Sequence, residues 1–181
     1  MKNVALFLAK GFEEIEALAT IDILRRAEIS VQTVSITHDN YVEGAHGIKV
    51  TTDTVFADLD FSTVDVLVLP GGMPGAKHLN EHEELKEQLK IFAERGNTVA
   101  AICAAPMVLG GLGLLEGKKA TCYPGFESEL TGATITGNSV EVSGNIITGK
   151  GPGFVFDFAL QLVETIAGIE VRKRVQEGLL L

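Results

Sequence analysis

The chain has 181 residues, of which 46% are hydrophobic and 22% charged, a balance typical of a folded globular protein rather than a disordered one. Its net charge of −9, with no sustained run of lysine and arginine, argues against nonspecific nucleic-acid binding. We therefore expect a single domain over residues 1–181, large enough to bury a core, with no nucleic-acid partner.

Two cysteines supply neither a disulfide framework nor the spacing of a zinc site, which predicts reduced thiols and a cytoplasmic protein. The apolar N-terminal run stops at Ala9 and is followed by glutamates, so it is too short for a signal peptide. A proline and three glycines interrupt the uncharged stretch 98–115, which we interpret as a buried strand and a helix. No membrane partner is expected.

The predicted elements alternate between strand and helix along the chain. Strands are expected at 4–9, 31–36, 65–69, 99–102 and 120–122, with a hairpin or edge at 47–55 and a hairpin at 140–148. Helices are expected at 13–27, up to Gly96, after Cys103, along the stripe of Phe154, Phe158, Leu162 and Ile166, and after Gly168. This order predicts an α/β fold with a mostly parallel sheet and helices on both faces.

Cys103 is the most informative residue, because it lies where the buried strand at 99–102 runs into a predicted helix. A side chain on such a turn projects from the sheet edge, beside free backbone N–H groups and the positive end of the helix dipole, which favour a thiolate. Pro106 suits the first turn of that helix, where its missing N–H costs nothing. The residues leave two interpretations open, a reactive thiol and a buried core cysteine.

Glu16 shares one face of the first predicted helix with a set of mostly apolar residues, namely Ala19, Thr20, Ile23 and Ala27. Burial on that face would raise the pKa of its carboxyl, which indicates a functional acid. Glu13 and Glu14 lie nearer the helix start and fit the simpler role of complementing the helix dipole. Because parallel strands open at one edge, we expect Glu16 to meet Cys103, with its protonation state left open.

Successive glycines follow the strand that ends at Leu69. Such a turn lets backbone N–H groups face a developing negative charge, although it can also be a plain strand-ending turn. We nominate the N–H groups of Gly71, Gly72 and Ala104 as oxyanion donors. The spacing is not that of a dinucleotide-binding loop, and no cofactor is expected.

The four histidines and the second cysteine offer no clear partner for the thiol. Asn80 followed by Glu83 predicts a helix N-cap, which would leave His78 outside the helix and argues against a metal site with His82. Cys122 is interpreted as a buried structural residue, with a resolving thiol as the alternative. The remaining histidines lie in loop-like surroundings with no evident partner: His38 and His46.

Four segments, in the same order over nearly the whole chain, together resemble the DJ-1/ThiJ/PfpI superfamily, and most nearly its DJ-1/YajL-like branch: Lys10–Glu16, Leu69–Ala76, Ala100–Pro106 and Gly151–Phe154. The resemblance implies a flavodoxin-like three-layer α/β/α sandwich that forms a homodimer. It also implies a nucleophilic Cys103 at a strand-to-helix elbow, hydrogen-bonded to a protonated Glu16, with Gly71, Gly72 and Ala104 as backbone donors. Members are associated with glutathione-independent glyoxalase and deglycase activity, with oxidative-stress sensing through a cysteine sulfinate, and with chaperone-like behaviour.

Three positions depart from the family patterns. Ala104 stands where PfpI-type peptidases and amidases carry histidine, which weakens peptide hydrolysis. Tyr123 stands where DJ-1 has a histidine; a phenol is a poor base near neutral pH, but it can still hydrogen-bond a carbonyl. Lys150 stands where arginine is common, so the charge is kept without the bidentate fork.

We therefore expect a cysteine enzyme that acts on methylglyoxal-like dicarbonyls or on their early adducts with amines and thiols. Cys103 would be the nucleophile, Glu16 would move protons, and Tyr123 would steer the substrate. The alternatives are a non-catalytic redox sensor or chaperone that uses Cys103 oxidation, and, more weakly, a PfpI-type peptidase or amidase in which a histidine reaches the thiol.

Overall fold

The computed structural model describes residues 2–181, and its centre is a seven-stranded sheet in the order β10-β11-β7-β6-β1-β2-β5. All neighbouring strands are parallel except β10 and β11, which form an antiparallel hairpin. The strands of this sheet are β1 (Asn3–Leu8), β2 (Ser30–Ser35), β5 (Thr54–Val55), β6 (Val66–Leu69), β7 (Thr98–Ile102), β10 (Val140–Ser143) and β11 (Ile146–Gly149).

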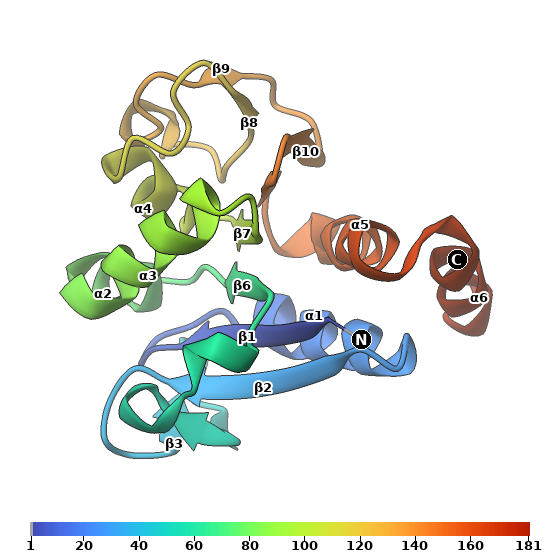
Figure 1. Ribbon diagram of the computed structural model, residues 1–181, viewed down its shortest axis with the longest axis horizontal. Coiled ribbons are helices and arrows are strands. Elements are labelled where there is room, and N and C mark those ends of the chain that lie inside the picture. Colours follow the sequence, from blue (N-terminus) through green and yellow to red (C-terminus); the bar gives the residue numbers. More distant parts are fainter. Residues whose placement is uncertain (1) are drawn as a thin grey trace.

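Helices cover both faces of the sheet, which gives the three-layer α/β/α sandwich (Figure 1). On one face lie α1 (Glu14–Arg26), α5 (Val155–Ala167) and α6 (Ile169–Gly178), with α1 packed against α5 and α5 against α6. On the other face lie α2 (Gly75–Glu81), α3 (Glu83–Glu94) and α4 (Pro106–Gly111). Within residues 2–181, no helix is both long and apolar enough to cross a bilayer.

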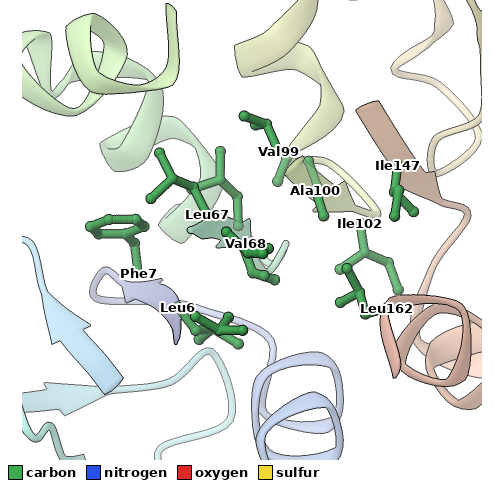
Figure 2. Close-up of a cluster of buried hydrophobic side chains, with 14 of the residues drawn as sticks. Leu6, Phe7, Leu67, Val68, Val99, Ala100, Ile102, Ile147 and Leu162 are labelled. Atoms are coloured by element: carbon green, nitrogen blue, oxygen red, sulfur yellow. The ribbon is translucent and has the colours of Figure 1, made fainter. Parts of the chain in front are cut away.

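The core forms where the central strands meet the helices, because these strands are apolar at nearly every position and are covered on both faces. Figure 2 shows side chains from β1, β6, β7 and β11 packed around this centre. Ile102, the last residue of β7, lies beside Leu162 of α5, and both are fully buried. The strand that leads to Cys103 is therefore held rigidly from both sides.

Two small pairings lie outside the main sheet. The hairpin of β3 (Tyr41–Glu43) and β4 (Lys49–Thr51) follows β2, and β8 (Lys119–Ala120) pairs with β9 (Thr134–Ile135). The expected hairpin or edge at 47–55 is confirmed in both senses, since β4 is in a hairpin and β5 is an edge strand. The strand expected at 120–122 ends at Ala120, and the sequence did not indicate β3 or β9.

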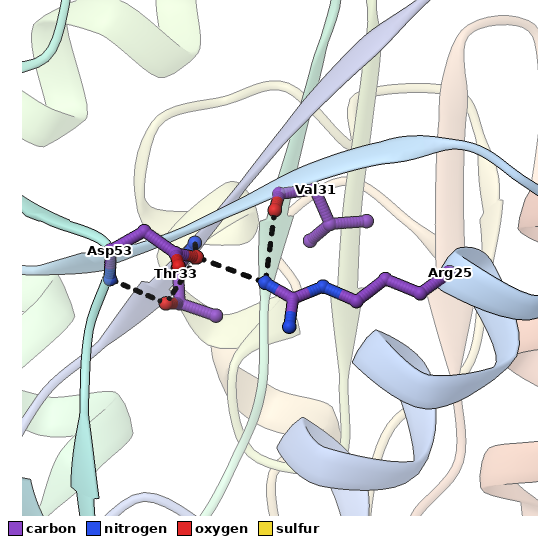
Figure 3. A network of polar contacts seen from close by, with 4 residues as sticks. All are labelled: Arg25, Val31, Thr33 and Asp53. Atoms are coloured by element: carbon purple, nitrogen blue, oxygen red, sulfur yellow. Dashed lines mark hydrogen bonds and ion pairs between the residues drawn. The ribbon is translucent and has the colours of Figure 1, made fainter.

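A polar network fixes the base of this hairpin to β2 and to the end of α1 (Figure 3). The Asp53 carboxylate accepts hydrogen bonds from the backbone and hydroxyl of Thr33, both at 2.8 Å, and from Arg25 at 3.0 Å. Arg25 also donates to the carbonyl of Val31. These bonds lower the pKa of Asp53, although its partial burial acts in the opposite direction. The hairpin therefore has a defined position over α1.

The helix N-cap expected at Asn80 is wrong. Asn80 lies inside α2, and the N-cap of α3 is His82, whose Nδ1 accepts a hydrogen bond from the backbone N–H of Leu85 at 3.2 Å. His78 is therefore helical, not outside a helix. A capping imidazole was not foreseen because the usual N-cap residues are serine, threonine, aspartate and asparagine.

Candidate active site

Cys103 lies at the carboxyl end of β7, directly after Ile102, in a turn that leads into α4. Its φ of 66° is in the left-handed region, which non-glycine residues rarely adopt and which marks functional sites. Its backbone N–H donates to the carbonyl of Gly149 at 2.9 Å, and its carbonyl accepts from Tyr123 at 2.8 Å. The turn is therefore fixed by the main chain, and the Cys103 side chain takes no part in holding it; the residue as a whole is 8% exposed.

Glu16 lies in the first turn of α1 and is completely buried. Its Oε2 accepts a hydrogen bond from the backbone N–H of Gly71 at 2.8 Å. Burial raises the pKa of Glu16 to about 7, against the opposing effects of hydrogen bonds with Cys103 and Gly71, and the charge of Glu13 raises it further. The carboxyl is therefore poised to gain or lose a proton near neutral pH.

The loop after β6 separates α1 from Cys103 and admits only glycine at two positions. A Cβ on Gly71 would lie 2.6 Å from the Cβ of Cys103 and 2.7 Å from Oε2 of Glu16. Gly72 has a φ of 87°, and a Cβ there would lie 2.3 Å from the backbone nitrogen of Glu13. The two glycines thus allow Glu16 and Cys103 to approach each other.

Two of the three nominated backbone donors act on the Cys103 thiol. Burial raises the pKa of this thiol, and the N–H groups of Gly72 and Ala104 oppose that rise. The third expectation needs correction, because the N–H of Gly71 is bonded to Glu16 and is not free for an oxyanion. Gly71 therefore orients the carboxyl of Glu16 instead.

Cys103 and Glu16 act on each other as a coupled acid pair. Burial raises the pKa of the Cys103 thiol to about 12, and the charge of Glu16 and its hydrogen bond contribute to this rise. The first proton that leaves the pair on titration therefore comes from Glu16. The other carboxyl oxygen, Oε1, is buried and makes no hydrogen bond of normal geometry within residues 2–181. If the thiol proton moves to this carboxyl, the charge that opposes a thiolate disappears.

A cavity of about 280 Å³ opens beside the Cys103 turn. Its lining is mainly apolar and consists of Tyr123, Pro124, Lys150, Gly151, Pro152, Gly153 and Phe154. Both walls begin at backbone partners of Cys103, because Tyr123 bonds to its carbonyl and Lys150 follows Gly149. The Nζ of Lys150 donates to the carbonyl of Gly137 at 3.0 Å and lies 5.6 Å from the Phe154 ring centroid. Its charge is therefore held at the cavity rim.

The histidines do not form a dyad with the thiol. His78 hydrogen-bonds the carbonyl of Lys10, His82 caps α3, and His46 is bound by glutamates. Within residues 2–181, none of the four histidines hydrogen-bonds Cys103. The peptidase interpretation therefore has no geometric support.

The second cysteine, Cys122, is free and buried. Burial raises the pKa of its thiol to about 11, and the charge of Glu127 raises it further.

The sequence did not indicate that His46 has partners. Its Nδ1 lies 2.8 Å from Oε2 of Glu14 and 3.6 Å from Oε2 of Glu13, and its backbone N–H donates to Oε1 of Glu14 at 2.7 Å. Burial would raise the pKa of Glu14, but the hydrogen bonds from His46 and Ile48 lower it. Glu14 is thus buried beneath the β3–β4 loop, not an exposed acid at a helix start. No local pattern indicates a contact across 32 residues.

Comparison with known proteins decides the family. The DJ-1/PfpI family model matches residues 2–165. The chain belongs to the DJ-1/PfpI family. It is 42% identical over 171 residues to protein DJ-1 homolog B of Arabidopsis thaliana, covering 93% of this chain but 39% of that protein. A second Arabidopsis relative is covered over 47% of its length, so the chain spans less than half of these two proteins.

Two further members of the DJ-1/PfpI family bear on structure and function. The structure of Toxoplasma gondii DJ-1, oxidized, has a TM-score of 0.95 and 36% identity, over 99% of this chain and 98% of that one. The glutathione-independent glyoxalase DJR-1.2 of Caenorhabditis elegans is 35% identical over 160 residues, or 87% of this chain and 84% of that protein. The DJ-1 fold expected from the four sequence segments is confirmed.

Proposed function

We propose that the protein is a glutathione-independent glyoxalase or deglycase that uses Cys103 as its nucleophile and Glu16 as its acid–base group. The observation that carries the proposal is the buried Glu16 carboxyl, with its pKa raised to about 7, beside Cys103. A Cβ on Gly71 would contact both, at 2.7 Å from Oε2 of Glu16 and 2.6 Å from the Cβ of Cys103. A general base works best when its pKa lies near the working pH. The glyoxalase name of the C. elegans relative supports the same reaction class.

The reaction with methylglyoxal would begin at the aldehyde carbon. As the sulfur of Cys103 forms a bond to this carbon, the thiol proton passes to Glu16 and then to the new alkoxide oxygen, giving a hemithioacetal. The N–H groups of Gly72 and Ala104 stabilise the negative charge as it develops.

The second half of the reaction is an internal oxidation and reduction. Glu16 removes the proton from the former aldehyde carbon and returns it to the neighbouring carbon, while the hydroxyl proton on the former aldehyde carbon passes to the oxygen of the neighbouring carbon. These two transfers convert the hemithioacetal into a lactoyl thioester. Water then cleaves the thioester and releases lactate and the free thiol. Methylglyoxal and one water give lactate, so no external oxidant or reductant is consumed.

The direct test is lactate formation from methylglyoxal by the purified protein in buffer free of metals and added thiols. The proposal expects turnover that depends on Cys103 and Glu16. Absence of lactate together with intact folding would remove the glyoxalase assignment, whereas release of free amine from a glycated amino acid would retain the deglycase assignment.

The cavity beside Cys103 supports a prediction about substrate size. The Phe154 ring is 40% exposed at its wall, so phenylglyoxal should bury its ring there. We expect Phe154→Ala to reduce kcat/KM for phenylglyoxal by about tenfold, the usual cost of losing one apolar contact, and to change that for methylglyoxal by less than about twofold. Phe156→Ala is the matched control, because Phe156 is 42% exposed and does not line the cavity. Equal losses for both substrates would contradict the prediction.

A redox sensor is the second candidate, because Gly72, Ala104 and Glu16 would also hydrogen-bond the oxygens of a Cys103 sulfinate. The oxidized structure of Toxoplasma gondii DJ-1 supports this candidate. Mass spectrometry after graded peroxide distinguishes the two functions. Selective oxidation of Cys103 with negligible aldehyde turnover favours a sensor, and equal oxidation of Cys122 contradicts it.

The homodimer that the family resemblance implies and the cytoplasmic location expected from the two cysteines remain part of this proposal. The exposed apolar side chains of Ile15 and Leu18 on α1 offer a surface for a second copy. Light scattering of the purified protein should give a mass close to twice that of the chain, and a monomer at micromolar concentration would contradict the dimer.

A further inference from the structure

The start of α1 carries a second set of acidic groups that the proposed reaction does not use. Glu13 is the N-cap residue of α1 and Glu14 is its first residue. Their side chains are 13% and 6% exposed. Within the described chain, the ion pairs of both carboxylates are with one cation, His46. His46 is exposed, whereas Glu16, two residues after Glu14, is completely buried.

Glu13 connects this outer group to Glu16. Its backbone N–H donates to the carbonyl of Gly71 at 2.9 Å, and the N–H of the same glycine donates to Glu16. The charge of Glu13 also acts on Glu16 directly and raises the pKa of its carboxyl, in addition to the larger effect of burial. A negative charge on Glu13 therefore opposes a negative charge on Glu16, in agreement with the raised pKa of Glu16.

His46 has a fixed position although its ring is exposed. The β3–β4 loop is bound to the segment before α1 by two backbone bonds of 2.8 Å, from Gly11 to Glu43 and from Ala45 to Phe12. The other charged groups of the hairpin, Glu43 and Lys49, pair with each other. The groups that face His46 are thus Glu13 and Glu14 from α1. Their hydrogen bond and charges raise the pKa of His46, so it keeps its proton to higher pH.

We propose that the His46 imidazolium compensates the two carboxylates at the start of α1 and thereby tunes the reactivity of Cys103 without contacting it. His46 is a positioning residue in this scheme, acting through Glu13 on Glu16. The inference rests on the Cys103–Glu16 pair of the proposed function but not on any particular substrate.

Thiol alkylation gives a test that needs no enzymatic turnover. The rate of iodoacetamide labelling at Cys103, resolved from Cys122 by peptide mass spectrometry, is measured against pH in the full-length protein. In His46→Gln the carboxylates are uncompensated, so the first proton of the Cys103–Glu16 pair leaves at higher pH. The pH at which the labelling rate of Cys103 begins to rise should therefore increase by about half a unit, the size expected for one charge removed near a protein surface.

The matched variants separate charge from structure. His46→Arg keeps the positive charge and should retain the wild-type profile, and His38→Gln, at an exposed histidine of another loop, should leave it unchanged. Adding salt should reduce the shift in His46→Gln because partly exposed charges are screened. An unshifted profile in His46→Gln, or an equal shift in His46→Arg, would overturn the inference.

A measurement on the wild-type fold covers the case in which a His46 variant does not fold. NMR titration of the His46 ring should give a lower midpoint in Glu13→Gln than in wild type, because one of its two carboxylate partners is neutralised. An unchanged midpoint would show that Glu13 and His46 are not coupled and would overturn the inference. Loss of lactate formation with an intact alkylation shift would instead count against the proposed function alone.

Discussion

Replacing Cys103 by serine is expected to reduce lactate formation from methylglyoxal by at least about 10³-fold, the usual scale for loss of an enzymatic nucleophile. A serine hydroxyl beside Glu16 is a much weaker nucleophile than a thiol at neutral pH. The main-chain bonds to Gly149 and Tyr123 do not involve the side chain, so the turn should keep its shape. Lactate is measured in parallel with thermal unfolding, which should change little.

Cys122→Ser is the matched control for this variant. Cys122 is also free and buried, and its thiol pKa is also raised by burial, but among residues 2–181 no amide donor or carboxyl hydrogen-bonds it. We expect it to retain most of the activity. If Cys122→Ser lost activity and Cys103→Ser retained it, the assignment of the nucleophile would be wrong.

Glu16→Gln is expected to reduce turnover by about 10²- to 10⁴-fold, the range for loss of a general acid–base group. Glutamine keeps the size of the side chain and an oxygen that can accept from Gly71, but it cannot take the thiol proton. The dependence of turnover on a group with a pKa near 7 should therefore disappear. Glu129→Gln, at an exposed glutamate, is the control and should behave as wild type.

Glu16 should also affect how the stability of the protein depends on pH. The folded-state pKa of Glu16, about 7, lies above its ordinary value of 4.5, so the folded protein binds this proton more tightly than the unfolded chain does. The resulting stabilisation is fully present below about pH 4.5 and is lost as the pH rises through 7. The loss amounts to about 3 kcal/mol from the difference of the two values.

Chemical denaturation at several pH values checks this linkage. The unfolding free energy of the wild type should decrease by this amount between acidic and mildly alkaline pH. That of Glu16→Gln should not show this decrease. The difference between the two proteins isolates Glu16 from groups such as Glu14 and Asp53, whose pKa values are lowered and whose stabilisation is lost at acid pH instead. Parallel curves for the two proteins would mean that Glu16 titrates normally.

Much of the fold and the central pair could be predicted from the sequence because their signals are local. Runs of apolar residues set the strands of the sheet, and helical spacing placed Glu16 on the buried face of α1. The tendency of parallel strands to collect reactive groups at one edge then brought Glu16 and Cys103 together. The segment resemblance added the three-layer sandwich, which the structure confirms.

The remaining features depend on contacts between distant loops. The N–H of Gly71 is bonded to Glu16, which lies 55 residues away in the sequence. His46 reaches Glu14 only because the β3–β4 hairpin folds back over the start of α1. His82 caps α3 because α2 ends immediately before it. Neither residue type nor spacing carries this information.

The clamped main chain at position 103 also has a practical consequence. Because the left-handed turn is secured by the amide and carbonyl of residue 103 itself, the chemical identity of the atom beyond Cβ contributes little to holding it. The protein therefore offers a fixed position for other nucleophiles at residue 103, such as a selenol. Each would be presented to the same carboxyl and the same two amides, so intrinsic nucleophile strength could be compared in one unchanging environment.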